Sequence, residues 1–245
     1  MGIDECKLSG GELKPALLAG GPDFVIFYKP PGLETISGEG GEAGLLGLAR
    51  ELLDEPGLLP VHRLDRDTSG AQLFARHPAA EKGLVRLFRE RRVDKTYLAL
   101  CLGVPPNGKG VINRGLSPWS GGRRPIRILK RGGLAASTAY ERLAASAELP
   151  GGWRAGLLSF SPRQGRTHQI RVHAAAFGHP VLGDDRYGDR AANKLARDSL
   201  GLGRQALHAW RLAFDWRGER VAAVCPLPGD LRRAGEKAGF ALRKY

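Results

Sequence analysis

Charged and hydroxyl side chains gather in one short stretch of the sequence, Val61-His-Arg-Leu-Asp-Arg-Asp-Thr-Ser-Gly70. Apolar residues lie on both sides of it, at 58–61 and 73–75. Charged groups between two core-forming segments cost free energy unless they are paired or used in chemistry. The structural alternative is a turn, because Asp, Thr, Ser and Gly favour turns and Arg63 could pair with Asp65. Taken alone, the stretch favours the turn.

A second polar stretch, Gln164–Pro180, predicts a helix that carries functional side chains. Thr167 is a suitable N-cap, Gly178 suits the C-terminal cap and Pro180 prevents continuation. Apolar residues recur at helical spacing and predict one buried face: Ile170, Ala174 and Phe177. Arg171 falls outside this face, so the helix presents it together with the neighbouring histidines.

Three histidines in this stretch raise the question of a metal site. His168 and His173 are five residues apart, which differs from the i, i+4 pair of a zinc helix, and no glutamate lies between them. Ser69 lacks the GxSxG context of a hydrolase nucleophile. We therefore predict no metal and no hydrolase triad. We expect structural, hydrogen-bonded roles for the histidines His62, His168, His173 and His179.

The composition points to a globular protein that binds a polyanion. The chain has 245 residues, of which 42% are hydrophobic, so it can form a core. Its 38 Lys and Arg against 25 Asp and Glu give a net charge of +13, which attracts nucleic acid first and an anionic membrane surface second. A general solubility bias is the alternative.

The termini and the cysteines bear on localisation. Cys6, Cys101 and Cys225 are few and far apart, which fits a reducing compartment and offers neither a disulfide framework nor a zinc motif. The first residues lack the pattern of a signal peptide, and no apolar run approaches the ~20 residues of a membrane span. We expect a cytoplasmic protein without a membrane partner.

The hydrophobic pattern predicts an α+β protein with a mainly antiparallel, mixed sheet flanked by helices and loops. We expect an N-terminal arm or edge strand over residues 1–23 and a single domain over 24–245. The predicted strands are 24–28, 71–75, 95–102, 136–143, 153–160 and 204–216, and the predicted helices are 45–53, 79–90, 167–178 and 230–241.

Residues 105–133 are rich in Gly, Pro and basic side chains. The basic residues are Arg114, Arg123, Arg124, Arg127, Lys130 and Arg131. A solvated loop with a hairpin and a strip that contacts phosphates are both open at this point.

Taken together, the motifs resemble those of the RluA-type pseudouridine synthases. The two polar stretches carry the resemblance, through His62-Arg-Leu-Asp-Arg-Asp-Thr-Ser-Gly70 and Gly165-Arg-Thr-His-Gln-Ile-Arg-Val-His173. Further matches occur in the expected order at 28–33, 94–100, 178–188 and 207–209. Several motifs in order are far more specific than a single Arg-Leu-Asp.

The resemblance implies the pseudouridine synthase catalytic fold and isomerisation of uridine to pseudouridine in structured RNA, either ribosomal or transfer RNA. It assigns the catalytic carboxylate to Asp65, the base-stacking tyrosine to Tyr97 and the basic partner of the aspartate to Arg171. Arg63 would help to fill the gap left by the extruded nucleotide, and Leu207 would line the pocket. Relatives often carry an S4 RNA-binding domain, for which we expect no room here.

The chemistry fits these residue types. Breaking the N1–C1′ bond develops positive charge on the sugar, which a carboxylate can stabilise or trap, so Asp65 must be ionised. A nearby Arg171 would favour the charged form. The target base must be flipped out of its stack. The reaction involves no redox change, so we expect no cofactor, and nothing requires a protein partner or more than a monomer.

Two alternatives remain at this level. A non-catalytic RNA-binding module would share the charge but would not require the aspartate, tyrosine and arginine together. A hydrolase of a nucleoside or sugar bond would need a second carboxylate as acid, for which Asp67 is the nearby candidate. A turn or ion-pair role for Asp67 is the simpler explanation.

Overall fold

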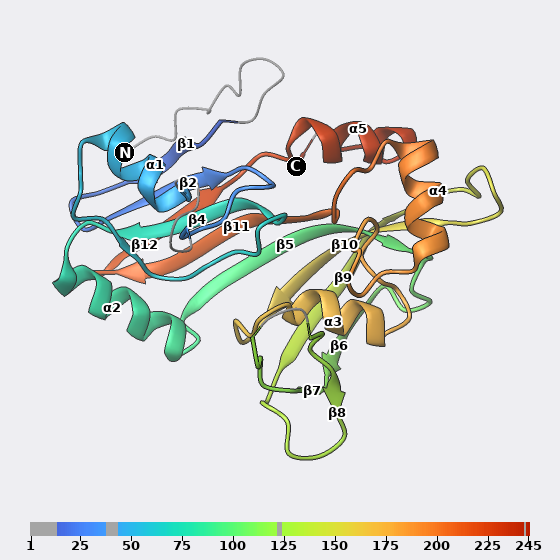
Figure 1. Ribbon diagram of the computed structural model, residues 1–245, viewed down its shortest axis with the longest axis horizontal. Coiled ribbons are helices and arrows are strands. Elements are labelled where there is room, and N and C mark those ends of the chain that lie inside the picture. Colours follow the sequence, from blue (N-terminus) through green and yellow to red (C-terminus); the bar gives the residue numbers. More distant parts are fainter. Residues whose placement is uncertain (1–13, 38–43, 122–123, 243) are drawn as a thin grey trace. The chain divides into compact units, whose positions relative to one another are not determined.

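A computed structural model describes residues 14–37, 44–121, 124–242 and 244–245 of the chain. The chain divides into two compact units, the first formed by residues 1–95 and 209–228 and the second by 96–208 and 229–245. Both units contain antiparallel strands and helices (Figure 1). The prediction of an α+β fold with a mainly antiparallel sheet is therefore confirmed. The expectation of one domain over residues 24–245 stays a prediction.

In the first unit, neighbouring strands follow the order β1-β2-β4-β11, with β12 beside β11 and β3 beside β4. The elements are β1 Ala16–Gly20, β2 Phe24–Lys29, α1 Leu45–Leu53, β3 Leu59–Pro60, β4 Ser69–Ala75, α2 Pro78–Arg89, β11 Leu207–Trp216 and β12 Glu219–Val224. β1 is an edge strand that pairs with β2, as expected for part of the N-terminal arm; residues 1–13 of that arm lie outside the described residues.

Two helices cover opposite faces of this sheet, because successive apolar side chains of a strand point to opposite faces. Along β2, Ile26 packs in the cluster that contains Leu84 of α2, and Phe27 packs in the cluster that contains Leu45 of α1. Every residue of β2 and β4 is buried, as expected for central strands covered on both faces. The polar stretch that precedes β4 is therefore attached to a fully buried strand.

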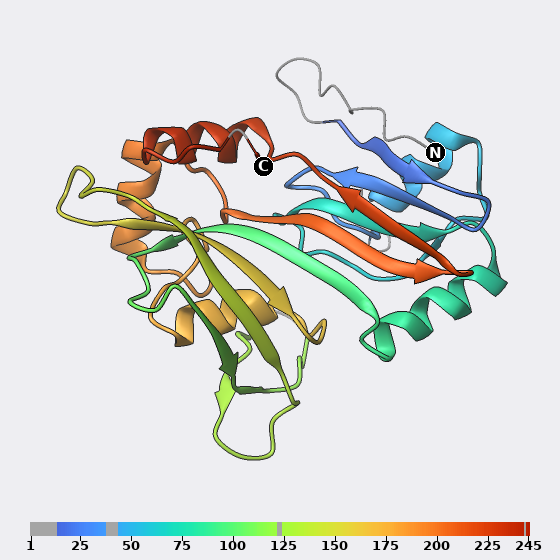
Figure 2. The same cartoon turned by 180° about the vertical axis from the view of Figure 1, so that it is seen from behind.

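In the second unit, the sheet has the order β5-β10-β9-β6 (Figure 2). The elements are β5 Val93–Leu102, β6 Lys109–Asn113, β7 Gly115–Leu116, β8 Ile128–Leu129, β9 Ser137–Ala145, β10 Ala155–Pro162, α3 Gln169–Ala176, α4 Arg190–Leu200 and α5 Gly229–Lys237. The short strands β7 and β8 form a separate hairpin within residues 105–133. α4 packs against α5, and no sequence pattern above predicted α4 or β12.

No helix in the described part of the chain is long and apolar enough to cross a membrane.

Candidate active site

Asp65 lies in a tight turn between β3 and β4. The amide of Thr68 donates to the carbonyl of Asp65 at 3.0 Å, which closes the turn. Leu64 is buried, Asp65 is half-buried and Arg63 is exposed. The turn predicted from residue types is confirmed, and it holds the Asp65 backbone in place beside the buried strand β4.

A buried ammonium group clamps this turn. Lys29, at the end of β2, has no exposed surface, and its Nζ donates to the carbonyls of Pro30, Leu33 and Arg66 at 2.9, 2.7 and 2.8 Å. An ammonium group has three donors, so these carbonyls satisfy them and offset the cost of burial. Because Arg66 directly follows Asp65, the clamp fixes the position of the aspartate backbone.

Side chains hold the residues just before Asp65 as well. The amide of Leu64 donates to Thr35 Oγ1 at 3.1 Å, and Gln72 Nε2 donates to the carbonyl of His62 at 2.7 Å. The imidazole of His62 accepts from the amide of Leu73 through Nε2 at 3.0 Å, which leaves the ring proton on Nδ1. Burial lowers the pKa of His62 to about 3, so this ring is neutral at physiological pH.

Gly70 closes the stretch at a point where only glycine fits. Its φ of +124° lies in a region that disfavours side chains, and a Cβ there would be 2.3 Å from the carbonyl oxygen of Ala209 in β11. The backbone of this stretch therefore approaches β11 directly.

Tyr97 and Leu207 belong to the second unit. Tyr97 is a half-buried residue of β5 and pairs in register with Phe160 of β10. Leu207 is the buried first residue of β11, a strand whose residues from Ala209 onward belong to the first unit. Strand pairing fixes Tyr97 on the same face as Phe160, so its direction is set by the sheet.

Arg171 lies in the first turn of α3, whose start differs from the prediction. The N-cap is His168, with a φ of +56° and no capping side-chain bond, so the assignment of Thr167 as N-cap was wrong. A positive φ costs about 1 kcal/mol or more in a residue other than glycine. The 2.8 Å contact between His168 Nδ1 and the Tyr187 hydroxyl helps to hold this conformation.

The C-terminal end of α3 follows the prediction. The amide of Gly178 donates to the carbonyl of Ala175 and that of His179 to the carbonyl of Ala174, both at 3.0 Å. This pair is a Schellman motif, and Gly178 has the positive φ that it requires.

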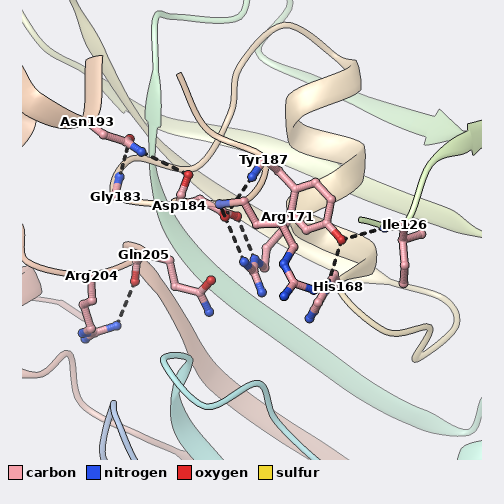
Figure 3. A network of polar contacts seen from close by, with 10 residues as sticks. Ile126, His168, Arg171, Gly183, Asp184, Tyr187, Asn193, Arg204 and Gln205 are labelled. Atoms are coloured by element: carbon pink, nitrogen blue, oxygen red, sulfur yellow. Dashed lines mark hydrogen bonds and ion pairs between the residues drawn. The ribbon is translucent and has the colours of Figure 1, made fainter. Parts of the chain in front are cut away.

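The guanidinium of Arg171 is bound side-on by a buried carboxylate, Asp184 (Figure 3). Arg171 Nε lies 2.7 Å from Asp184 Oδ2, and Nη2 lies 2.8 Å from Oδ1. The two side chains are only 11% and 1% exposed. Burial by itself raises the pKa of Asp184, but hydrogen bonds and charge from Arg171 outweigh it and hold the pKa below its ordinary value.

Tyr187 adds a second contact to the same guanidinium. The Arg171 guanidinium carbon lies 5.2 Å from the centre of the Tyr187 ring, within the range of a cation–π interaction. The Tyr187 hydroxyl accepts from the amide of Ile126 at 3.0 Å and contacts His168 (Figure 3). Asp184 Oδ1 also accepts from the amides of Arg186 and Tyr187. These contacts fix the plane of the Arg171 side chain.

The histidines have the structural roles that we expected. His173 is fully buried, with Nδ1 against Thr138 Oγ1 at 2.8 Å and Nε2 against the Arg114 carbonyl at 3.0 Å. His179 Nδ1 lies 3.0 Å from the carbonyl of Leu102. Within the described residues, no group of three His, Cys, Asp or Glu side chains could hold a metal ion.

Of the predicted site residues, Asp65 and Arg63 lie in the first unit, and Tyr97, Arg171 and Leu207 lie in the second. Their chemical roles stay predictions. Sequence reasoning gave no role to three side chains that position them: Lys29, Asp184 and Tyr187. The sequence offered one signal for them: all three lie in motifs that match the family, at 28–33 and 178–188. Polar residues of such motifs often support a neighbouring functional group.

Comparisons with known proteins give one consistent result. Residues 23–176 match a family model described as RNA pseudouridylate synthase. Ribosomal large subunit pseudouridine synthase C of Haemophilus influenzae is 37% identical over 197 residues, which are 78% of this chain and 58% of that protein. The chain therefore spans less than two thirds of the length of this relative.

Two solved structures resemble the chain. Human RNA Pseudouridylate Synthase Domain Containing 1 has a TM-score of 0.71 at 30% identity, covering 88% of this chain and 84% of that one. Human RNA Pseudouridylate Synthase Domain Containing 4 has a TM-score of 0.73 at 25% identity, covering 91% and 92%.

Proposed function

Because this chain belongs to the RNA pseudouridylate synthase family, we propose that it isomerises uridine to pseudouridine in structured RNA. The observation that carries the proposal is the family match over residues 23–176, a span that includes Asp65, Tyr97 and Arg171. The resemblance to this family that was drawn from the motifs is confirmed.

The proposed reaction assigns one role to each of these three side chains. Asp65 is the catalytic carboxylate, which stabilises or traps the sugar while the N1–C1′ bond breaks. Tyr97 stacks on the uracil while it turns, and the C5–C1′ bond then forms. C5 gives up its proton and N1 gains one, so the product is an isomer and no cofactor takes part. Arg171 keeps Asp65 ionised.

The rigid surroundings of these residues support the proposal. A reacting group that is displaced by about 1 Å can lose roughly 100-fold in rate. Lys29 restrains the backbone at Asp65, and Asp184 with Tyr187 restrains Arg171. Functional groups that must be held accurately are typically restrained by supporting side chains of this kind.

The substrate must present a uridine that can leave its stack. Flipping a base costs a few kcal/mol, and least where the RNA is not a continuous duplex. Arg63 would fill the space of the extruded nucleotide, and Leu207 would line the pocket. The net charge of +13 supplies attraction to phosphates. The H. influenzae relative is named for the ribosomal large subunit, so ribosomal RNA is the first substrate to test and transfer RNA the second. We propose a cytoplasmic monomer that needs neither a membrane nor a protein partner.

The test is a comparison of two neighbouring carboxylates. Total RNA that lacks this modification is incubated with the wild type, Asp65→Asn or Asp67→Asn, and pseudouridines are mapped. We expect the wild type to form pseudouridine, Asp65→Asn to form none and Asp67→Asn, an exposed neighbour, to stay within several-fold of the wild type. Arg171→Ala should lose more rate than RNA affinity.

Each competing function has its own outcome. RNA binding without any pseudouridine formation would identify a non-catalytic binding module. Release of free uracil that depends on both Asp65 and Asp67 would identify a hydrolase. Full turnover by Asp65→Asn would refute the assigned chemistry.

A further inference from the structure

The stretch between Asp94 and Glu141 has an extreme charge bias. Residues 95–140 contain eight Lys and Arg and no Asp or Glu. We call residues 114–121 and 124–131 the basic lobe; its basic side chains, all exposed, are Arg114, Arg124, Arg127, Lys130 and Arg131. None of these five has an ion-pair partner within the part of the chain that the structure describes. Exposed cations that form no ion pair offer a surface suited to phosphates.

Trp119 is exposed within this lobe. Half of its surface, 50%, is accessible, whereas Trp153 is 8% exposed and donates its Nε1 proton to the carbonyl of Pro150 at 3.0 Å. Trp216 is partly buried and donates to Asp23. No ring or cation stacks on Trp119 among the described residues. An exposed indole offers a flat apolar face, and tryptophan is enriched at binding surfaces.

Buried apolar contacts and backbone hydrogen bonds anchor the basic lobe. Leu116 and Ile126 are buried in a cluster with Val172 of α3. The amides and carbonyls of Leu116 and Leu134 exchange two hydrogen bonds at 3.0 and 2.7 Å, and the Ser117 amide donates to the Arg127 carbonyl at 2.9 Å. The lobe therefore presents Trp119 from an anchored base, which reduces the entropy that binding must remove.

We propose that Trp119 is a base-stacking contact for an unpaired nucleotide of the RNA, with the cations of the basic lobe on the flanking phosphates. The combination of an aromatic face with exposed arginines is how proteins bind single-stranded nucleic acid. The choice of RNA as ligand rests on the proposed function. An anionic membrane fits less well, because the lobe contains no amphipathic helix and offers one indole rather than an apolar face.

The test separates stacking from charge. Binding of a labelled stem-loop RNA, and of a duplex without unpaired bases, is measured by fluorescence anisotropy at several salt concentrations. Trp119→Ala should weaken stem-loop binding by about 5- to 150-fold, the range expected for the loss of one stacked base. It should leave duplex binding and the salt slope unchanged. Trp119→Phe should retain most of the affinity.

Two further variants serve as comparisons. Leu52→Ala removes another exposed hydrophobic side chain, 62% exposed on α1 outside the lobe, and should leave affinity unchanged. Arg124→Ala should weaken both RNAs and reduce the salt slope by about one phosphate contact. RNA should quench tryptophan emission in the wild type, and this quenching should be lost in Trp119→Phe.

Unchanged stem-loop affinity in Trp119→Ala would overturn the proposal. So would an equal loss for duplex RNA, or binding of anionic vesicles that depends on Trp119. Because binding is measured without turnover, its outcome is independent of the proposed function. A stacking contact in a protein that forms no pseudouridine would uphold this inference and refute the proposed activity.

Discussion

Replacing Asp184 by asparagine should destabilise the second unit and slow the reaction. The substitution keeps the size of the side chain and the Oδ1 acceptor for the amides of Arg186 and Tyr187. It removes the negative charge and places an amide group against the guanidinium of Arg171, where both groups are donors. The guanidinium, 11% exposed, then lacks its carboxylate.

The size of the effect follows from the burial of the pair. Removing one partner of a buried ion pair typically costs about 3–5 kcal/mol, because the other charge stays desolvated. For a protein of 245 residues this corresponds to a decrease in melting temperature of about 6–20 °C. Loss of the fixed Arg171 orientation should lower kcat by about 100-fold while RNA affinity changes little.

The measurement is urea unfolding of the wild type and variants at neutral and acid pH. Asp198→Asn is the control, because Asp198 pairs with Lys194 on the exposed face of α4, and such pairs contribute about 0.5 kcal/mol or less. A double-mutant cycle of Asp184→Leu with Arg171→Met should show a coupling above about 2 kcal/mol, since removing both charges costs less than removing one.

The contribution of Asp184 to stability should depend on pH. The folded-state pKa of Asp184 lies below its ordinary value, so its stabilising contribution is complete above that ordinary value and is lost as the pH falls through the folded-state pKa. The difference between wild type and Asp184→Asn should therefore shrink in acid. A decrease in stability below about 1 kcal/mol at neutral pH, together with additive effects in the cycle, would show that the pair contributes little.

Two further predictions concern the turn that carries Asp65. Gly70→Ala should lower the free energy of unfolding by about 3 kcal/mol or more, because its Cβ would meet the Ala209 backbone. Gly32→Ala, which also has a positive φ but has open space around its Cβ, should cost about 1 kcal/mol. Equal losses in urea unfolding would contradict the steric account. His62→Gln should reduce the stability that is lost as the pH falls from about 6.5 to 3. Burial and the charge of Lys95 keep His62 neutral in the folded protein, whereas the unfolded chain binds a proton there, so the wild type loses up to about 1.4 kcal/mol of stability per pH unit. Parallel curves of stability against pH for the two proteins would exclude this cause.

Regular hydrophobic patterns predicted most elements well. The helix at 45–53 has the bounds of α1, and the strand at 24–28 is β2 apart from one residue. The helix has apolar side chains at helical spacing, and the strand is a short run of β-branched and aromatic residues; both are local properties of the chain. α4 was missed because the helix is polar on average and its buried face, formed by Ala192, Asn193, Ala196 and Leu200, contains only one large apolar side chain.

Local rules failed where a distant group decides the conformation. Thr167 has the right residue type for an N-cap, yet α3 begins at a left-handed His168 whose ring contacts Tyr187, nineteen residues later. A capping preference is worth only about 1 kcal/mol, so tertiary contacts can override it.

The sequence by itself determined the family, the motif residues and the type of most helices and strands, because ordered motifs and hydrophobic periods are written along the chain. Tertiary structure alone decided the partners: which carbonyls accept from Lys29, and that Asp184 binds Arg171 across thirteen residues. Hydrogen bonds and ion pairs depend on direction and distance to within a few tenths of an ångström, and those are fixed only when separate elements pack together.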